Sequence, residues 1–147
     1  METLQQLRSA VEQGFLLHGS LRQLTSLVPK QARDSEKVSG NRSAVYATKN
    51  VLIAVLCGLR HPTGRNFTFG WTGVEEDLKV FGHDVKLEDG YVYLLSADEF
   101  QQTFNDDGSP SGEYASEKEV IPTGVVAITP EILSQFPDLV IEIEDKA

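Results

Sequence analysis

The sequence predicts a single α+β domain whose sheet is mostly antiparallel. Its 147 residues contain short apolar runs that alternate in the manner of strands, interrupted by a few stretches with helical periodicity. The longest apolar run covers residues 51–57 and is far too short to cross a bilayer. A chain of this length suits one hydrophobic core, so we expect residues 1–147 to form one domain.

The amino-terminal part of the chain predicts a helix followed by a buried strand. The first apolar residues have helical spacing as far as Gly14, where the pattern stops. The next apolar run, residues 15–17, leads into the tripeptide His-Gly-Ser of residues 18–20. A run this short between glycines favours a strand over a helix. A second, weaker helix is expected over residues 21–28.

The following segment predicts a loop, a strand and a helix. Residues 34–43 are polar and show no apolar period, which is typical of an exposed loop. Residues 45–47 then form a short strand, and the apolar residues 51–59 form a helix. Either Thr48 or Asn50 is expected to cap that helix, because both side chains can accept a hydrogen bond from its first turn.

The middle of the chain alternates in strand fashion. Ser96 and Glu99 then have the spacing of a capping box, which predicts a short helix as far as Phe104. Three strands are expected before it, over residues 67–71, 78–81 and 91–95.

The carboxy-terminal part predicts a loop, two strands and a helix between them. Residues 105–116 are rich in Asn, Asp, Gly, Ser and Pro, so a surface loop is expected. Residues 120–128 favour a strand interrupted by Pro122. Residues 129–131 start a helix with proline at its first position, and residues 139–144 alternate as a strand with one solvated face does.

Charge is divided unequally between the two halves of the chain. Residues 1–73 hold nine basic and four acidic side chains, residues 74–147 hold four basic and 18 acidic ones, and the net charge is −9. An acidic chain repels phosphate, which argues against general nucleic-acid binding. The basic first half suits a small anionic ligand, and the acidic second half suits a basic partner.

Cysteine content and the amino-terminal residues exclude several classes of protein. Cys57 is the single cysteine, so no internal disulfide forms, and no Cys/His cluster predicts a metal site. The first residues lack the basic and apolar regions of a signal sequence. We therefore expect a cytoplasmic protein with no membrane span and no bound metal.

Three motifs follow one another along the chain at predicted elements. The first strand closes on His18-Gly19-Ser20, a later strand carries Tyr46 ahead of a helix, and residues 113–122 contain glutamates in front of an apolar pair. Together these motifs resemble the ADP-ribosyltransferase superfamily, in its branch with a His, Tyr, Glu triad shared by diphtheria-type toxins and poly(ADP-ribose) polymerases. The resemblance covers the order of the triad and most of the pattern of elements.

The resemblance implies NAD as co-substrate and gives each motif a role. His18 would hold a ribose hydroxyl or the carboxamide of NAD, Gly19 and Ser20 would contact the carboxamide, and Tyr46 would stack on the nicotinamide. A glutamate would bond a ribose hydroxyl and stabilise the oxocarbenium-like state in which the glycosidic bond breaks. The reaction would release nicotinamide and transfer ADP-ribose to a protein or small-molecule acceptor.

Three glutamates compete for the catalytic position. We expect Glu119 because it directly precedes the apolar strand residues 120–121, with Glu117 and then Glu113 behind it. Glu117 and Glu119 would share one face of an extended strand. This spacing resembles the arginine-modifying branch of the superfamily, where the first acid orients the acceptor, so Glu117 is expected to do so here. That branch pairs the two acids with an arginine where this chain has His18.

The basic first half supplies candidates for the pyrophosphate of NAD. Arg33 lies 15 residues after His18, about where the polymerases place an arginine toward the adenosine or pyrophosphate end, and Lys30 is close by. The polymerases also have a second tyrosine about where Leu56 and Cys57 stand here. Together with the short chain, this departure favours single transfer to a specific target over polymer building.

Two other interpretations stay open at this point. An RNA 2′-phosphotransferase is similar at its His-Gly motif but uses a further His and Arg set, and the acidic net charge argues against an RNA substrate. A noncatalytic module on the same fold would keep an ADP-ribose or NAD site and present its acidic half to a partner protein.

Overall fold

The computed structural model of the chain describes residues 3–31, 43–59, 68–71, 78–82, 87–104, 106–136 and 140–143. Its α-helices are α1 (Thr3–Glu12) and α2 (Val51–Leu59), and 3₁₀ helices cover Ala97–Glu99 and Pro130–Gln135. The strands are β1 (Leu16–Ser20), β2 (Lys30–Gln31), β3 (Ser43–Thr48), β4 (Thr68–Trp71), β5 (Leu78–Gly82), β6 (Gly90–Leu95), β7 (Gln101–Phe104), β8 (Pro110–Ser116), β9 (Gly124–Ile128) and β10 (Val140–Ile143).

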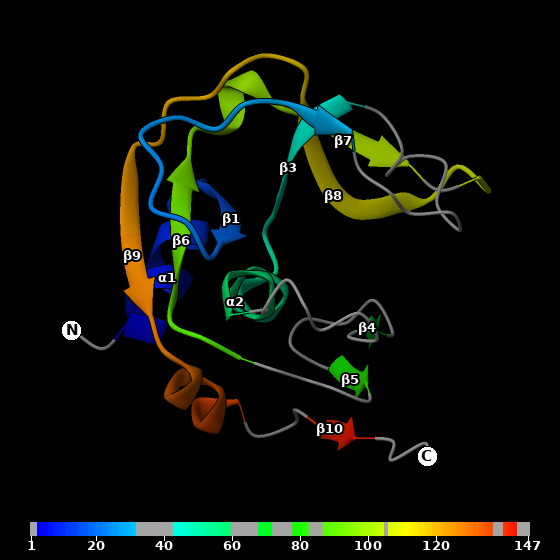
Figure 1. Cartoon of the computed structure of the whole chain (residues 1–147). Coiled ribbons are helices and arrows are strands. Elements are labelled where there is room, and N and C mark those ends of the chain that lie inside the picture. The colour runs from blue at the N-terminus through cyan, green and yellow to red at the C-terminus, as the bar shows by residue number, and fades with distance from the viewer. Residues whose placement is uncertain are drawn as a thin grey trace.

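The main sheet runs in the order β7-β8-β3-β1-β6-β9, with β2 beside β3 (Figure 1). All its strand pairs are antiparallel. A second sheet has the order β10-β5-β4 and contains the parallel pair β10–β5. The prediction of an α+β fold with a mostly antiparallel sheet is therefore confirmed.

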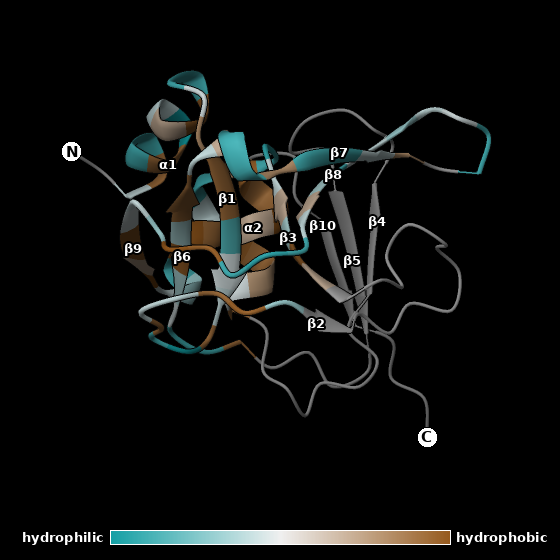
Figure 2. Ribbon diagram, turned by 90° about the horizontal axis from the view of Figure 1, so that it is seen from above, coloured by the Kyte–Doolittle hydropathy of each residue, from teal (hydrophilic) through white to brown (hydrophobic). Residues whose placement is uncertain are grey.

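Helix α2 forms the centre of the larger hydrophobic core. It is apolar throughout, and seven of its residues are buried. Asn50 caps the helix, because its Oδ1 accepts a hydrogen bond from the backbone N–H of Ile53 at 3.1 Å. Helix α1 adds Leu4 and Leu7 to the same core, and hydrophobic residues gather on α2 and the strands around it in Figure 2. Burying one such leucine contributes about 1.5–3 kcal/mol.

A second core lies at the other face of the central strands. It contains Leu16 of β1, Val45 and Ala47 of β3, and Tyr93 of β6. Segments that follow β1 and β8 cover these residues, since Leu27 and Val120 form an antiparallel bridge and are both buried. The central strands therefore have apolar residues on both faces, as strands buried between two layers do.

Three predictions of local structure are wrong in the described residues. Residues 21–28 form no helix: the segment contains bends, and Leu27 forms an antiparallel bridge with Val120. Residues 106–116 are no simple loop, because β8 begins at Pro110 and pairs with β7 as a hairpin. The helix expected as far as Phe104 is likewise a single 3₁₀ turn followed by β7.

Among the described residues, no helix has the length and apolar character needed to span a membrane. The longest are α1 with 10 residues and α2 with nine. The loop expected over residues 34–43 lies outside the described part of the chain except for Ser43, which opens β3.

Candidate functional site

His18 lies where two central strands separate. Leu17 of β1 pairs with Thr48 of β3, and this is the one registered pair between the two strands in the described residues. Beyond it β1 continues to pair with β6 as far as Ser20, while β3 pairs with β8. The imidazole of His18 connects the separating strands, because its Nδ1 lies 2.6 Å from the carbonyl oxygen of Tyr46.

This hydrogen bond defines the chemistry that His18 offers. A carbonyl oxygen only accepts hydrogen bonds, so Nδ1 of His18 must carry the proton and donate. In the neutral ring Nε2 is then an acceptor, and in the protonated ring it is a donor. In a neutral His18 ring, Nε2 is therefore the hydrogen-bond acceptor.

Tyr46 and Glu113 lie on the same face of neighbouring strands. Tyr46 of β3 pairs with Ala115 of β8, and Thr48 pairs with Glu113. Because alternate residues of a strand share a face, Tyr46 and Glu113 are diagonal neighbours across the pair, within reach of each other's long side chains. Both side chains are partly buried. Their arrangement puts an aromatic ring and a carboxylate at one surface of the sheet.

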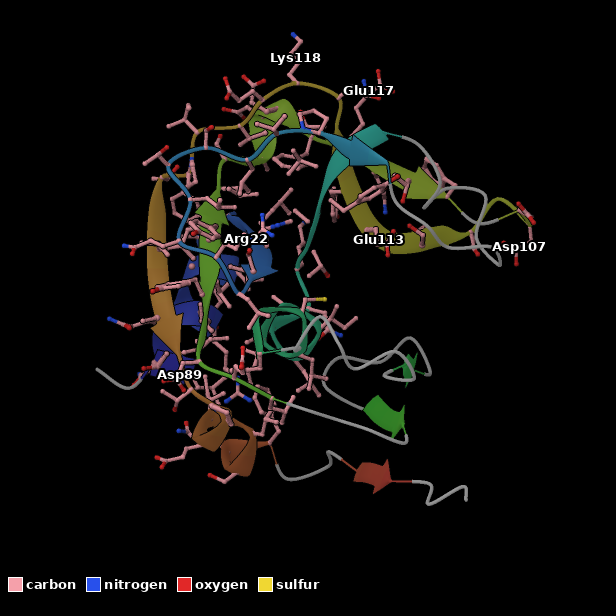
Figure 3. All side chains as sticks on the ribbon, viewed as in Figure 1. Arg22, Asp89, Asp107, Glu113, Glu117 and Lys118 are labelled. Atoms are coloured by element: carbon pink, nitrogen blue, oxygen red, sulfur yellow. The ribbon has the colours of Figure 1, made fainter. Side chains whose placement is uncertain are left out.

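Glu117 and Glu119 lie in the loop after β8, and the strand predicted through residues 120–121 is wrong. Strand β8 ends at Ser116 and the next strand begins at Gly124, so neither acid belongs to a strand. Both side chains are exposed. In Figure 3 Glu117 lies at the opposite end of β8 from the hairpin tip that carries Asp107, with Glu113 between them.

The carboxylate of Glu119 already has a partner in the fold. Its Oε2 accepts a hydrogen bond of 2.9 Å from the hydroxyl of Ser26, in the segment that follows β1. This contact joins the two segments that cover the second core, next to the bridge between Leu27 and Val120. Glu119 therefore connects two surface segments through a hydrogen bond. Glu113 is the glutamate that lies on the strand beside Tyr46.

Gly19 and Ser20 complete the end of β1. Gly19 lies against α2, because a Cβ atom there would lie 2.0 Å from the carbonyl oxygen of Ala54 and 2.5 Å from the backbone nitrogen of Gly58. The glycine is thus required for the packing of the strand on the helix. The Ser20 hydroxyl oxygen accepts a hydrogen bond of 3.1 Å from the backbone N–H of Arg22, where the chain turns out of the strand.

Of the two basic residues expected to bind the pyrophosphate of NAD, only Lys30 lies among the described residues. Lys30 opens β2 and its backbone pairs with Ala44, two residues before Tyr46 on β3. Arg33 lies outside the described residues. Cys57 is partly buried in α2. Within the described part of the chain, no group of three or more His, Cys, Asp and Glu side chains is arranged to hold a metal ion.

Two hydroxyls that sequence reasoning missed lie next to Glu113. Thr103 of β7 and Ser111 of β8 are both buried and both hydrogen-bond to the backbone of Glu113. No local pattern distinguishes them, because residues 105–116 have the composition of a loop. Only the pairing of β7 with β8 brings the two hydroxyls together.

Hydrogen bonds to Ser109 perturb one carboxylate at the tip of the same hairpin. They lower the pKa of Asp107, first through the Ser109 hydroxyl and then through its backbone N–H, because both donors favour the ionised form. The backbone bond measures 2.9 Å. The turn therefore carries a charge that persists to lower pH than an isolated aspartate would.

Comparison with protein-family models, with curated proteins and with solved structures finds no match to the chain.

Proposed function

We propose that the chain is an NAD-dependent ADP-ribosyltransferase that transfers ADP-ribose to a protein or small-molecule acceptor. The observation that supports this proposal is the placement of His18, Tyr46 and Glu113 on the successive strands β1, β3 and β8. The imidazole is bonded to the Tyr46 carbonyl, and the carboxylate shares a face with the Tyr46 ring. Residues far apart in the sequence are thus brought onto neighbouring strands at the separation of β1 from β3, with the His18 side chain on the face of the second core and Tyr46 and Glu113 on the opposite face.

The chemistry of these side chains suits the nicotinamide ribose. His18 Nε2 would accept a hydrogen bond from a ribose hydroxyl or the carboxamide, and Tyr46 would stack on the nicotinamide with about 0.5–1.5 kcal/mol beyond its area burial. When the bond between C1′ and nicotinamide breaks, its electron pair leaves with nicotinamide and positive charge develops on the ribose. The Glu113 carboxylate would oppose that charge.

Transfer then needs a nucleophile and a base. The acceptor attacks C1′ of the ribose, a new bond forms there, and the acceptor loses its proton. Glu113 is the group beside the site that can take it, because a carboxylate accepts a proton once the charge on C1′ has been quenched. The second half of the chain, with its excess of 14 negative charges, favours a basic acceptor by electrostatic complementarity.

The surroundings of Glu113 argue against an arginine-modifying arrangement. That arrangement needs a second acid two residues before the catalytic one, and here the position holds Ser111. The Ser111 side chain is 8% exposed and its hydroxyl donates to the carbonyl of Thr103 at 3.1 Å. Neither its chemistry nor its burial equips it to orient a guanidinium, so the proposed acceptor group is not an arginine.

The decisive experiment compares two glutamate variants. The protein is incubated with NAD, and nicotinamide release is followed by chromatography for the wild type, Glu113→Gln and Glu119→Gln. Each change removes a charge and keeps the size of the side chain. We expect Glu113→Gln to lower kcat by about 100- to 1000-fold, the loss typical of a group that stabilises transition-state charge. Glu119→Gln should stay near the wild-type rate.

Other outcomes identify the alternatives. Activity lost only in Glu119→Gln would contradict the assignment of Glu113 and identify Glu119 as the catalytic glutamate. A wild-type protein that binds NAD or ADP-ribose without releasing nicotinamide would be the noncatalytic module. A wild-type protein that neither binds NAD nor cleaves it would overturn the proposed function altogether.

A further inference from the structure

Glu113 lies at an irregularity in the pairing of β7 with β8. The register shifts between Gln102 and Phe104, so that Thr103 alone stands opposite residues 111–113 of β8. Gly112, in the middle of these three residues, has a φ of 85°, which glycine adopts without strain. Irregularities of this kind change the direction of a side chain and are frequent next to active sites. The strand is therefore bent at the residue before Glu113.

Two buried hydroxyls replace the missing ladder bonds at this point. Thr103 Oγ1 donates to the carbonyl oxygen of Glu113 at 3.1 Å, and the backbone N–H of Glu113 donates to Ser111 Oγ at 3.1 Å. The two hydroxyls also lie within hydrogen-bonding distance of each other, so one of their two protons is shared between two acceptors. Their side chains are 5% and 8% exposed, so water does not compete freely for these bonds. Both backbone polar groups of Glu113 are thus held by side chains.

The neighbouring strand holds the same segment from its other side. Thr48 Oγ1 donates to the carbonyl oxygen of Gly112 at 3.3 Å and accepts the N–H of Asn50 at 3.0 Å. Buried backbone groups are almost always paired, and here three side-chain hydroxyls supply the pairing around one residue. With its N–H and C=O both fixed, Glu113 has little freedom in φ and ψ, and the direction of its Cα–Cβ bond is set.

We propose that Thr103 and Ser111 are positioning residues that fix the Glu113 carboxylate for the reaction, an inference that rests on the proposed function. Neither hydroxyl needs to touch NAD, because both act through the backbone of Glu113. A reacting group displaced by about 1 Å loses up to roughly 100-fold in rate. The expected signature of the two hydroxyls is therefore a change in kcat with little change in KM for NAD.

The test removes each hydroxyl and keeps a matched control. Thr103→Val and Ser111→Ala delete the hydroxyls, and Thr103→Ser restores one. Ser116→Ala is the control, since Ser116 lies on the same strand, is 3% exposed and bonds the backbone of Lys118 in the same manner. Nicotinamide release, urea unfolding and the hydrogen-exchange rate of the Glu113 amide are measured for every variant.

We expect Thr103→Val and Ser111→Ala to lower kcat by roughly 10- to 100-fold with KM for NAD unchanged. Thr103→Ser should recover the wild-type rate. Ser116→Ala should keep the wild-type rate even if it lowers the stability as much as the two hydroxyl deletions do. Unchanged kcat in both hydroxyl deletions would overturn the proposal. If the wild type releases no nicotinamide, the proposed function fails by itself. The fixing of the Glu113 backbone by the two hydroxyls is then judged by hydrogen exchange: a faster rate at the Glu113 amide in Ser111→Ala supports it, and an unchanged rate contradicts it.

Discussion

His18 Nδ1 donates a hydrogen bond of 2.6 Å to the main-chain carbonyl of Tyr46 and so joins two strands that have ceased to pair. The bond uses only the near nitrogen of the ring, whereas the proposed contact with NAD uses the far one. These two functions can be separated by substitution. Asparagine carries a donor at the position of Nδ1 and has no counterpart of Nε2.

We expect His18→Asn to retain the stability of the wild type and to lose kcat/KM for nicotinamide release by about 10- to 100-fold, the value of one lost hydrogen bond in a buried site. His18→Ala should lose both activity and stability, since the Tyr46 carbonyl then loses the imidazole as a donor. Urea unfolding and initial rates with NAD measure the two effects. Full activity in His18→Asn would show that Nε2 does not contact the substrate.

The elements with strong local signals were predicted correctly from the sequence. The apolar run before His18 becomes β1, the segment around Tyr46 becomes β3, and the capped apolar stretch of residues 51–59 becomes α2. Each of these carries its own periodicity or cap, so the sequence alone sufficed. The positions of His18 and Tyr46 on strands followed directly.

The position of Glu113 was not predictable in the same way. The strand β8 that carries it contains Pro110, Ser111 and Gly112, none of which favours a strand by itself. Pairing with β3 on one side and β7 on the other creates the strand, together with the buried hydroxyls between them. Because the signal is tertiary, the sequence alone favours Glu119 in the following loop and ranks Glu113 behind it.

Substitution of Gly19 tests the packing of β1 on α2. A Cβ atom at this position would lie 2.0 Å from the Ala54 carbonyl oxygen, which belongs to the backbone of the helix and cannot move away alone. We expect Gly19→Ala to lower the free energy of unfolding by roughly 3 kcal/mol, at the upper end for overpacking. Urea unfolding followed by circular dichroism measures the loss.

A strand glycine on the same sheet provides the control. At Gly124 of β9 the nearest atom to an added Cβ is Leu94 Cδ1 at 3.4 Å, which is an ordinary contact. Gly124→Ala should therefore unfold near the wild-type midpoint. If Gly19→Ala were as stable as Gly124→Ala, the close approach of β1 to α2 would be wrong.

The hairpin tip gives a prediction about pH. Asp107 has its pKa lowered first by the Ser109 hydroxyl, so Ser109→Ala should raise this pKa toward its ordinary value, and Ser109→Thr should leave it low. A lowered pKa stabilises the fold above the pKa of the unfolded chain and ceases to do so as the pH falls through the folded value. The difference in the free energy of unfolding between Ser109→Ala and the wild type should thus be present at neutral pH and vanish in acid. A carboxyl-carbon NMR titration measures the pKa, and equal values in both proteins would contradict the assigned cause.

Tyr93 holds the segment that leaves the site after Ser20. Its side chain is 1% exposed, and its hydroxyl donates to the Arg22 carbonyl at 2.7 Å and accepts the Leu24 N–H at 2.5 Å. Tyr93→Phe leaves both backbone groups without this partner, which costs about 1–3 kcal/mol. We expect a lower urea midpoint and faster hydrogen exchange at the Leu24 amide.

Tyr91→Phe is the matched control for this change. Tyr91 lies on the same face of β6 with its ring centroid 6.5 Å from that of Tyr93, and no hydrogen bond of its hydroxyl is found among the described residues. Loss of the Tyr91 hydroxyl should leave the Leu24 amide protected from hydrogen exchange. Equal stability of the two variants, with wild-type exchange at Leu24 in both, would mean that the bridge between Leu27 and Val120 holds the segment without help from Tyr93.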